Sequence, residues 1–325
     1  MAKNRLTVVM YHYVRDLKNS RFPLIKGLDV GLFKEQLDYL EKYYHVVSME
    51  DVMAFVYDGI DLPDKPVLLT FDDGYADHFT NVFPILYNRG IQGSFFAPVK
   101  AITEHIVLDV NKIHFILAAI KDIRELLETV RKLLDEYREV YKLESFEYYN
   151  KLAYASRFDP ADVIFIKRLL QVELEENARR KVTDKLFRQV IGLDEDVFSR
   201  ELYMNEEQIH CMVKCGMHIG VHGYDHYWLG ALSRERQEIE IQKSLDFIQR
   251  MNVKDWSICY PYGSYNRDTL ELVKRYGCKL GLTTEVGIAI LDKSDRDSVY
   301  CLPRLDTNDL PKDAGAPVNK WYDIL

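Results

Sequence analysis

The chain has 325 residues, of which 47% are hydrophobic and 29% are charged. This composition is typical of a folded protein and excludes intrinsic disorder as the main state. The 43 basic and 51 acidic residues give a formal net charge of −8 without a dense lysine or arginine stripe, so nucleic acid is not expected as a partner. No apolar run approaches the roughly 20 residues that cross a bilayer, so we expect no transmembrane segment.

The cysteines and the N-terminal residues bear on the cellular compartment. The five cysteines are odd in number and scattered, which does not fit a disulfide framework. Cys211 and Cys215 lie four residues apart, but no second pair follows at the spacing of a zinc site. The apolar stretch 6–10 is too short for a secretory signal and lacks a small-residue cleavage site. We therefore expect reduced thiols and a cytoplasmic protein.

The first hundred residues alternate between short apolar runs and segments with helical periodicity. Strands are predicted at 6–10, 67–71 and 93–98, and helices around 33–44 and 76–88. Strands that alternate with helices in this way predict βαβ units and a parallel sheet.

Residues 103–200 have a different pattern. Apolar residues fall on one helical stripe through 123–140, and charged residues fill the other faces. Asp159 and Pro160 have the form of a helix N-cap followed by proline at the first helical position. We predict a helical insertion, which could act as a lid over a substrate pocket or as the surface of a homo-oligomer.

Strand and helix alternate again after residue 200. The segment 306–325 is rich in Asp, Asn, Pro and Gly, which predicts a surface tail. Neither a phosphate-binding Walker loop nor a glycine-rich dinucleotide fingerprint is present, so a nucleotide cofactor is not expected. The predicted strands are 218–222, 257–260 and 278–283, and the predicted helices are 205–215, 234–250 and 266–276.

The first chemically informative motif is T-F-D-D-G-Y at 70–75, at the end of an apolar strand. Consecutive strand side chains point to opposite faces, so Asp72 and Asp73 can address one site only if the chain turns there. Gly74 permits such a turn. One carboxylate could then bind a metal while the other acts as a base. The alternative is a simple strand-to-helix turn in which one aspartate caps the next helix.

The second motif is H-G-Y-D-H at 222–226. His222 and His226 could bring two imidazoles to one cation, and imidazole with carboxylate suits Zn²⁺ or a similar transition metal. Two ordinary surface histidines are the alternative.

The third motif, Y-P-Y-G at 260–263, forces a sharp turn after an apolar strand, so an amide there could face a ligand. The alternative is a tight turn with aromatic packing and no functional role. All three motifs follow predicted parallel strands, whose carboxyl ends carry the sites of α/β proteins. One aspartate and two histidines leave coordination positions open, as in catalytic rather than structural metal sites.

Together and in this order, the three motifs resemble those of the polysaccharide deacetylase family, the NodB homology domain of carbohydrate esterase family 4. The resemblance implies an irregular (β/α)7-type barrel, which would carry the predicted helical insertion as a large inserted helical subdomain. The expected barrel comprises 1–102 and 201–310, the insertion 103–200 and a C-terminal tail 311–325.

The resemblance also implies roles for individual residues. Asp73, His222 and His226 would bind a divalent transition metal, Zn²⁺ in the first place and otherwise Co²⁺ or Ni²⁺. Asp72 would be the general base that deprotonates the metal-bound water. The backbone amide of Tyr262, together with the metal, would stabilise the oxyanion of the tetrahedral intermediate.

Two positions depart from the family pattern. The third motif usually begins with an arginine that orients the base, but Cys259 stands there, and we expect Arg304 to supply the guanidinium from a later strand. The family also has a late histidine as general acid, and no histidine follows His226. His12, at the end of the first strand, is the candidate replacement, with a structural role as the alternative.

The sequence thus predicts a metal-dependent hydrolase that removes an N-acetyl group from the sugar of a glycan or glycan precursor. A deformylase or another amide hydrolase on the same scaffold is an alternative. Two non-enzymatic alternatives are an inactive module that binds a glycan or a partner, and an assembly protein built around the helical insertion.

Overall fold

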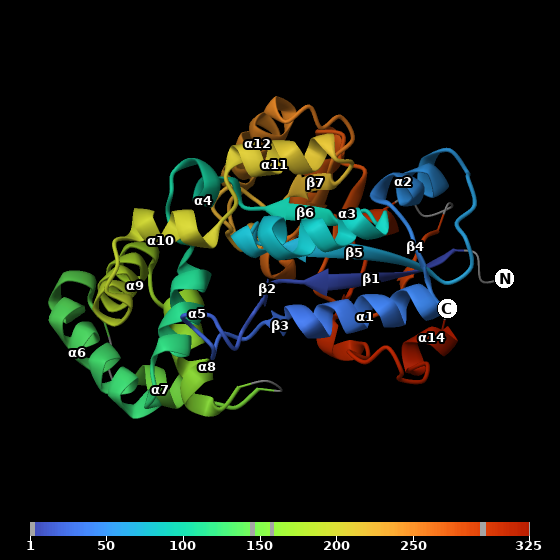
Figure 1. Ribbon diagram of the computed structural model, residues 1–325. Coiled ribbons are helices and arrows are strands. Elements are labelled where there is room, and N and C mark those ends of the chain that lie inside the picture. The colour runs from blue at the N-terminus through green and yellow to red at the C-terminus, as the bar shows by residue number, and fades with distance from the viewer. Residues whose placement is uncertain (1–3, 144–146, 157–158, 293–296, 325) are drawn as a thin grey trace. The chain divides into compact units, whose positions relative to one another are not determined.

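The computed structural model describes residues 4–143, 147–156, 159–292 and 297–324. The chain divides into two compact units. Figure 1 shows the chain coloured by residue number, from blue at the N-terminus to red at the C-terminus. The second unit comprises Leu17–Lys26 and His105–Ser199, and the rest of the chain forms the first. The second unit therefore includes a short N-terminal segment that lies within the predicted barrel.

The first unit is built on a mostly parallel sheet. Along the described residues the strand order is β10-β1-β5-β6-β7-β8-β9, and β10 alone runs antiparallel to its neighbour on that path. β11 and β4 add to it by pairing with β1 and β5, and β2 pairs with β3 separately. The strands are β1 Arg5–Tyr11, β2 Val14–Arg15, β3 Leu28–Asp29, β4 His45–Val46, β5 Pro66–Asp72, β6 Ser94–Ala97, β7 His218–Val221, β8 Ser257–Cys259, β9 Leu280–Leu282, β10 Ala289–Ile290 and β11 Leu305–Asp306.

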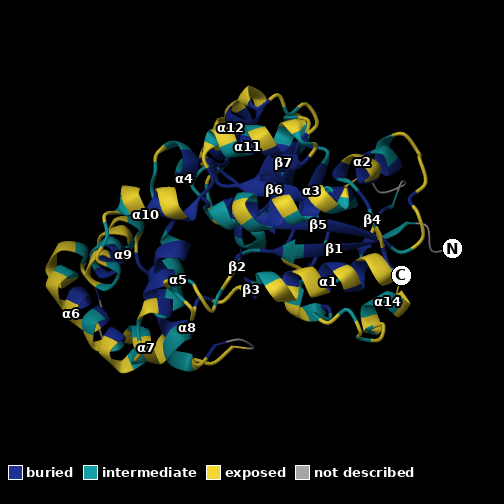
Figure 2. Ribbon diagram, viewed as in Figure 1, coloured by how far each residue is buried: buried dark blue, intermediate teal, exposed yellow. Residues whose placement is uncertain are grey.

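The strands form where the sequence is continuously apolar, because both faces of a parallel sheet are covered. Every residue of β5, β6 and β7 is buried. Figure 2 shows these strands in dark blue, whereas the surrounding helices alternate between buried and exposed residues. The helices of this unit are α1 Val30–Tyr43, α2 Met49–Tyr57, α3 Phe83–Arg89, α4 Val99–Thr103, α11 Glu206–Lys214, α12 Arg234–Arg250, α13 Arg267–Arg275 and α14 Lys320–Ile324.

A short segment near the C-terminus joins the two edges of this sheet. Leu302 forms a parallel bridge with Leu282 of β9, and three residues later Leu305 pairs with Val9 of β1. The sheet therefore curls into an irregular barrel, which confirms the predicted fold class. Arg304 lies within the closing segment, and its side chain is completely buried.

The second unit is helical. Its helices are α5 Asp109–Ala119, α6 Ile123–Tyr141, α7 Glu147–Leu152, α8 Ala161–Arg168 and α9 Glu176–Ile191, and α10 Glu195–Leu202 runs from this unit into the first. The apolar stripe of α6 is buried at Leu126, Val130, Leu133 and Leu134, as its periodicity predicts, but Val140 at the end of the predicted stripe is 70% exposed.

The predicted start of α8 is wrong by one residue. The N-cap is Pro160 rather than Asp159, and no side chain in the described part of the chain caps this helix. The Asp159 carboxylate instead pairs with the ammonium groups of Lys26 at 2.5 Å and Lys167 at 2.8 Å. Two cations compete successfully with the helix amides, because charge-assisted hydrogen bonds are the stronger ones.

The C-terminal segment is anchored to the first unit. The side-chain amide of Gln36 donates to the carbonyls of Thr307 at 3.0 Å and Pro311 at 3.2 Å. The Tyr322 ring of α14 packs edge-on against Tyr44, with ring centroids 5.5 Å apart. Within the described part of the chain, no helix is both long and apolar enough to cross a membrane.

Candidate active site

The three motifs meet at one end of the barrel. Asp72 is the last residue of β5, His222 directly follows β7, and Tyr260 directly follows β8. β5, β6, β7 and β8 are consecutive in the sheet and parallel, so their carboxyl ends lie side by side. This is the edge at which α/β proteins place their sites.

A left-handed turn lets both aspartates face this site. Asp73 has φ 75° and Gly74 has φ 64°, so the chain reverses immediately after the strand. A Cβ on Gly74 would lie 2.7 Å from that of Ala97, so this position requires glycine. Asp72 and Asp73 are both buried. The turn is centred on Asp73 itself as well as on the glycine from which it was predicted.

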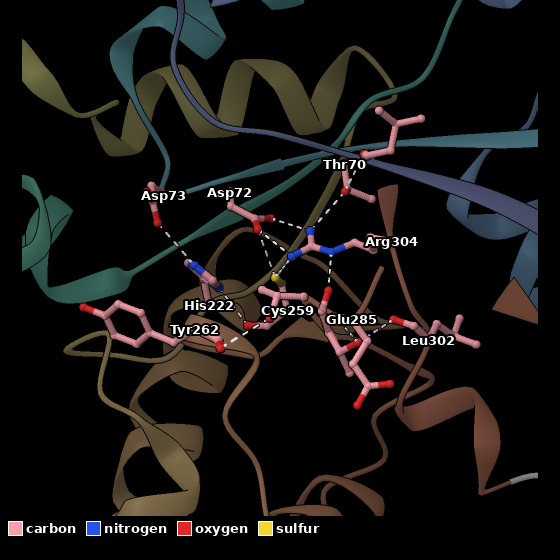
Figure 3. Close-up of polar contacts among 12 residues, drawn as sticks. Thr70, Asp72, Asp73, His222, Cys259, Tyr262, Glu285, Leu302 and Arg304 are labelled. Atoms are coloured by element: carbon pink, nitrogen blue, oxygen red, sulfur yellow. Dashed lines mark hydrogen bonds and ion pairs between the residues drawn. The ribbon is translucent and has the colours of Figure 1, made fainter. Parts of the chain in front are cut away.

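Asp73, His222 and His226 form a compact cluster. Oδ1 of Asp73 lies 3.3 Å from Nε2 of His222 and 3.4 Å from Nε2 of His226. The two Nε2 atoms are 3.2 Å apart. All three side chains are buried, and Figure 3 shows Asp73 and His222 pointing toward each other. The structure thus brings together the three residues predicted as metal ligands.

Neighbouring groups orient the cluster for a cation. The carbonyl of Cys259 lies 2.8 Å from Nδ1 of His222, and the Tyr75 hydroxyl donates to Oδ2 of Asp73 at 2.5 Å. These contacts leave Nε2 of His222 and Oδ1 of Asp73 for the centre of the cluster. Nδ1 of His226 is buried and has no hydrogen-bond partner among the described residues. Two imidazole nitrogens and one carboxylate oxygen form a donor set that fits Zn²⁺ and related divalent metals.

The electrostatics of the cluster favour a positive charge at its centre. Burial raises the pKa of Asp73, but hydrogen bonds from His222 and His226 outweigh burial and hold it well below its usual value. Burial lowers the pKa of His222, but Cys259 and Asp73 outweigh it and raise that pKa well above normal. Burial lowers the pKa of His226. One carboxylate and two imidazoles in this arrangement are ligands that bind a divalent cation.

Asp72 belongs to a second group, which Arg304 organises (Figure 3). The guanidinium of Arg304 donates to Oδ1 of Asp72 at 2.9 Å and to Oδ2 at 2.7 Å. The Cys259 thiol donates to Oδ2 at 3.2 Å and accepts from Arg304 at 2.9 Å. Burial raises the pKa of Asp72, but the charges of Arg304 and His222 outweigh it and lower that pKa to about 2. Asp72 is therefore ionised at neutral pH.

The same contacts argue against a second cation site. Asp72, His222 and Cys259 also place ligand atoms within 4.8 Å of one another. However, the Arg304 guanidinium already supplies a positive charge there, and burial raises the pKa of the Cys259 thiol. A protonated thiol is a poor metal ligand.

Arg304 is held in place by further hydrogen bonds. Its Nε donates to the carbonyl of Thr283 at 2.7 Å, and its Nη1 also donates to the Thr70 hydroxyl at 3.1 Å. The structure therefore places Arg304 beside Asp72, as the sequence predicted, and does so from the segment that closes the barrel.

Tyr262 and His12 lie at the same end of the barrel. Tyr262 has φ 57° in the turn Pro261–Gly263, and its ring packs edge-on against His226 and stacks on Trp228. His12 directly follows β1, which pairs in parallel with β5, and it is half-buried.

Two contributors escaped the sequence analysis. Tyr75 orients Asp73 through a hydrogen bond. Its place at the end of the first motif is the sequence signal that could have identified it. Cys259 occupies the position where the family pattern has an arginine, and its thiol contacts Asp72. A buried cysteine at the end of an apolar strand has no sequence signal that separates it from a core residue.

Comparison with known proteins identifies the family. The sequence model of the polysaccharide deacetylases matches residues 59–139 and 193–281, more than half of the chain. A putative polysaccharide deacetylase of Bacillus subtilis, YxkH, is 33% identical over 104 residues, or 32% of this chain and 36% of that protein. The poly-beta-1,6-N-acetyl-D-glucosamine N-deacetylase of Escherichia coli K12 is 36% identical over 85 residues, which cover 26% of this chain but only 12% of that enzyme.

Solved structures show the same fold over almost the whole chain. The Streptococcus pyogenes deacetylase PplD, in complex with acetate, matches with a TM-score of 0.56 at 19% identity and covers 94% of this chain and 93% of its own. IcaB from Ammonifex degensii matches with a TM-score of 0.55 at 19% identity and covers 94% of this chain and 92% of its own. With the family match across both parts of the barrel, these findings show that the chain belongs to the polysaccharide deacetylase family.

Proposed function

We propose that this protein hydrolyses N-acetyl groups of a glycan, with a divalent metal held by Asp73, His222 and His226. The observation that carries the proposal is the pairing of this buried cluster with an ionised carboxylate, Asp72, in the adjacent position. Zn²⁺ is the first metal to test. Such an ion supplies Lewis acidity, which lowers the pKa of a water molecule and polarises a carbonyl oxygen.

Asp72 is the proposed general base. Both of its oxygens receive hydrogen bonds from Arg304, so its orientation is fixed and its charged form is stabilised. In that form it can accept a proton. Because its pKa is low, Asp72 is a weak base, and it can accept a proton only from a group whose own pKa is lowered, such as a water molecule next to the metal. Arg304 acts through Asp72 and is a positioning residue.

The remaining steps need a donor for the oxyanion and a proton for the leaving amine. We assign the first role to the backbone N–H of Tyr262, in the tight turn next to His226. Donors that are already in place when charge develops stabilise the transition state strongly. We assign the second role to His12, which directly follows β1 at the same end of the barrel as the two aspartates.

The proposed substrate is an N-acetylated aminosugar in a glycan. The E. coli relative is named for poly-β-1,6-N-acetyl-D-glucosamine, which makes oligomers of that sugar the first substrates to test. A binding module without turnover is the second candidate, because no histidine follows His226 to serve as the late general acid of the family.

An Asp72→Asn variant separates these two functions. Protein loaded with Zn²⁺ is incubated with β-1,6-linked N-acetylglucosamine oligomers, and acetate and free amine are quantified. We expect equal amounts of both from the wild type and a loss of about 1000-fold in Asp72→Asn, within the range for a general base. Metal content should stay unchanged in this variant. Asp246→Asn, on the exposed side of α12, is the matched control.

Other products would point to the other candidates. Formate from an N-formyl sugar, without acetate from the acetylated one, would identify a deformylase. Binding of the oligomers by the loaded wild type without any acyl release would overturn the enzymatic proposal and leave the binding module.

A further inference from the structure

The turn that separates the two histidines of the cluster is conformationally demanding. Gly223 has φ 70° and His226 has φ 55°, so both lie in the left-handed region. A residue with a Cβ seldom adopts this conformation, and it persists only where the surroundings enforce it. His226 therefore needs outside contacts to stay directed at Asp73.

Glu240 supplies one side of those contacts from α12. Its Oε2 accepts hydrogen bonds from the backbone N–H groups of Tyr224 at 3.0 Å and Asp225 at 2.9 Å. The carboxylate also lies close over the turn, because a Cβ on Gly223 would be 3.5 Å from the same oxygen. Consecutive amides directed at one anion form an anion-binding concavity, here filled by a side chain of the same protein.

The segment that follows β6 holds the opposite side. The N–H of Lys100 donates to the carbonyl of Tyr224 at 2.9 Å, and the N–H of Val99 donates to that of Gly223 at 3.3 Å. The Lys100 ammonium also pairs with the Asp225 carboxylate. The turn 223–226 is thus held through its carbonyls by one segment and through its amides by Glu240.

Glu240 is buried, with 6% of its surface exposed. Burying a carboxylate costs free energy unless hydrogen bonds compensate for the lost hydration. A neutral hydrogen-bond acceptor could hold the turn at a smaller cost in free energy, so a purely structural role does not explain the charge at this position. The carboxylates of Glu240 and Asp225 and the ammonium of Lys100 together contribute one net negative charge to the turn. Glu104 and Lys243, which both contact the Tyr224 side chain, cancel each other in charge. The net negative charge attracts a cation.

We infer that Glu240 is a positioning residue for the metal site: it fixes the 223–226 turn so that His222 and His226 converge with Asp73, and its charge strengthens cation binding. The inference rests on the proposed metal-dependent function. Glu240 holds the turn through its hydrogen bonds with the amides of Tyr224 and Asp225, and it is not itself one of the proposed metal ligands.

The affinity for Zn²⁺ tests this directly, without any assay of turnover. Dissociation constants of the full chain are measured by competition with a chromophoric chelator for the wild type, Glu240→Gln and Glu240→Ala. Outer-shell partners of metal ligands typically contribute 10–100-fold in affinity, so we expect about 10-fold weaker binding in Glu240→Gln and about 100-fold in Glu240→Ala. The glutamine keeps an acceptor for the two amides but lacks the charge, so it separates the two contributions.

The visible spectrum of the Co²⁺-loaded protein adds a readout that stability alone would not move. We expect the ligand-field bands of Glu240→Ala to shift or weaken, because His226 is displaced. Glu238→Gln is the matched control: Glu238 lies on the same helix and pairs with Arg275 and Tyr276 away from the turn. Circular dichroism establishes that each variant is folded.

Each outcome has a distinct meaning. Wild-type affinity and an unchanged Co²⁺ spectrum in both Glu240 variants would refute the positioning role and leave the proposed function intact. Absence of metal binding by the wild type would refute the proposed function itself. If Glu240→Ala does not fold, the nearly isosteric Glu240→Gln decides, with equal affinity counting against the inference.

Discussion

The metal cluster and the Asp72 group lie at the same end of the barrel but are assembled in different ways. The metal cluster uses two histidines four residues apart and one aspartate 149 residues before them, and both Asp73 and His226 have a left-handed backbone in a turn that follows a strand. The Asp72 group instead joins side chains from β5, from the end of β8 and from the closing segment, and Arg304 lies 232 positions after Asp72 in the sequence. The first group depends on turn geometry and the second on closure of the barrel.

This difference predicts how each group fails. Loss of a cluster residue should remove the metal while the fold survives, because a cation site with fewer ligands weakens and the surrounding barrel does not depend on it. Loss of Arg304 should damage the fold as well, because it leaves a carboxylate buried without its counter-charge. Four substitutions test the contrast, from the largest expected effect to the smallest.

Asp73→Ala should abolish metal binding. Elemental analysis of the purified wild type should find about one divalent ion per chain, the number that one three-ligand site holds, and almost none in the variant. Metal chemistry supplies several kcal/mol of transition-state stabilisation, so acetate release should fall about 1000-fold or more. The exposed Asp246→Ala should retain both. Full metal content in Asp73→Ala would assign the cation to other residues.

Arg304→Met should destabilise the barrel by about 3–5 kcal/mol, the cost of breaking a buried ion pair. Urea denaturation measures this change in the free energy of unfolding. Much of it should be recovered in Arg304→Met with Asp72→Asn, because no unpaired charge then remains. Arg234→Met, which breaks exposed pairs with Asp268 and Glu271, should cost less than about 1 kcal/mol. Additive effects of the Asp72 and Arg304 substitutions would contradict the pairing.

His12→Ala should lower kcat about 100-fold if His12 protonates the leaving amine, the lower end of the range for general acid catalysis. The imidazole of His12 is half-buried and is part of neither the metal cluster nor the Asp72 group, so its removal should leave both groups in place. Metal content and the unfolding midpoint should change little. His45→Ala, at an exposed histidine, is the control. Unchanged turnover would remove His12 from the mechanism, and reduced stability with unchanged turnover would indicate a structural role.

Cys259→Ala should have the smallest effect. The thiol shares Oδ2 of Asp72 with Arg304, which continues to hold both carboxylate oxygens. We expect a loss of about 1 kcal/mol in stability, as for a single hydrogen bond, and less than about tenfold in kcat. Cys278→Ala, at another buried cysteine, is the control. A loss as large as that of Arg304→Met would mean that the thiol itself positions Asp72.

Much of the architecture follows from local signals. The apolar run at 67–71 and the helical stripe at 123–140 appear as β5 and α6, because hydrophobic periodicity acts within a few residues. The three-residue cluster could also be anticipated, since motifs that follow parallel strands meet at one edge. Asp159 shows the limit: its capping signal was overridden by two lysines, one of them distant in sequence.

The sequence by itself determined the strand ends, the turns after them and the types of side chain placed there. Only the tertiary structure decided which of those side chains pair. Arg304 reaches Asp72 because the segment from Leu302 to Leu305 bridges both edges of the sheet. Glu240 reaches the histidine turn because α12 packs against β7, although a glutamate on an amphipathic helix is ordinarily solvent-facing. Such contacts join residues whose proximity exists only once the barrel has closed, so no local pattern encodes them.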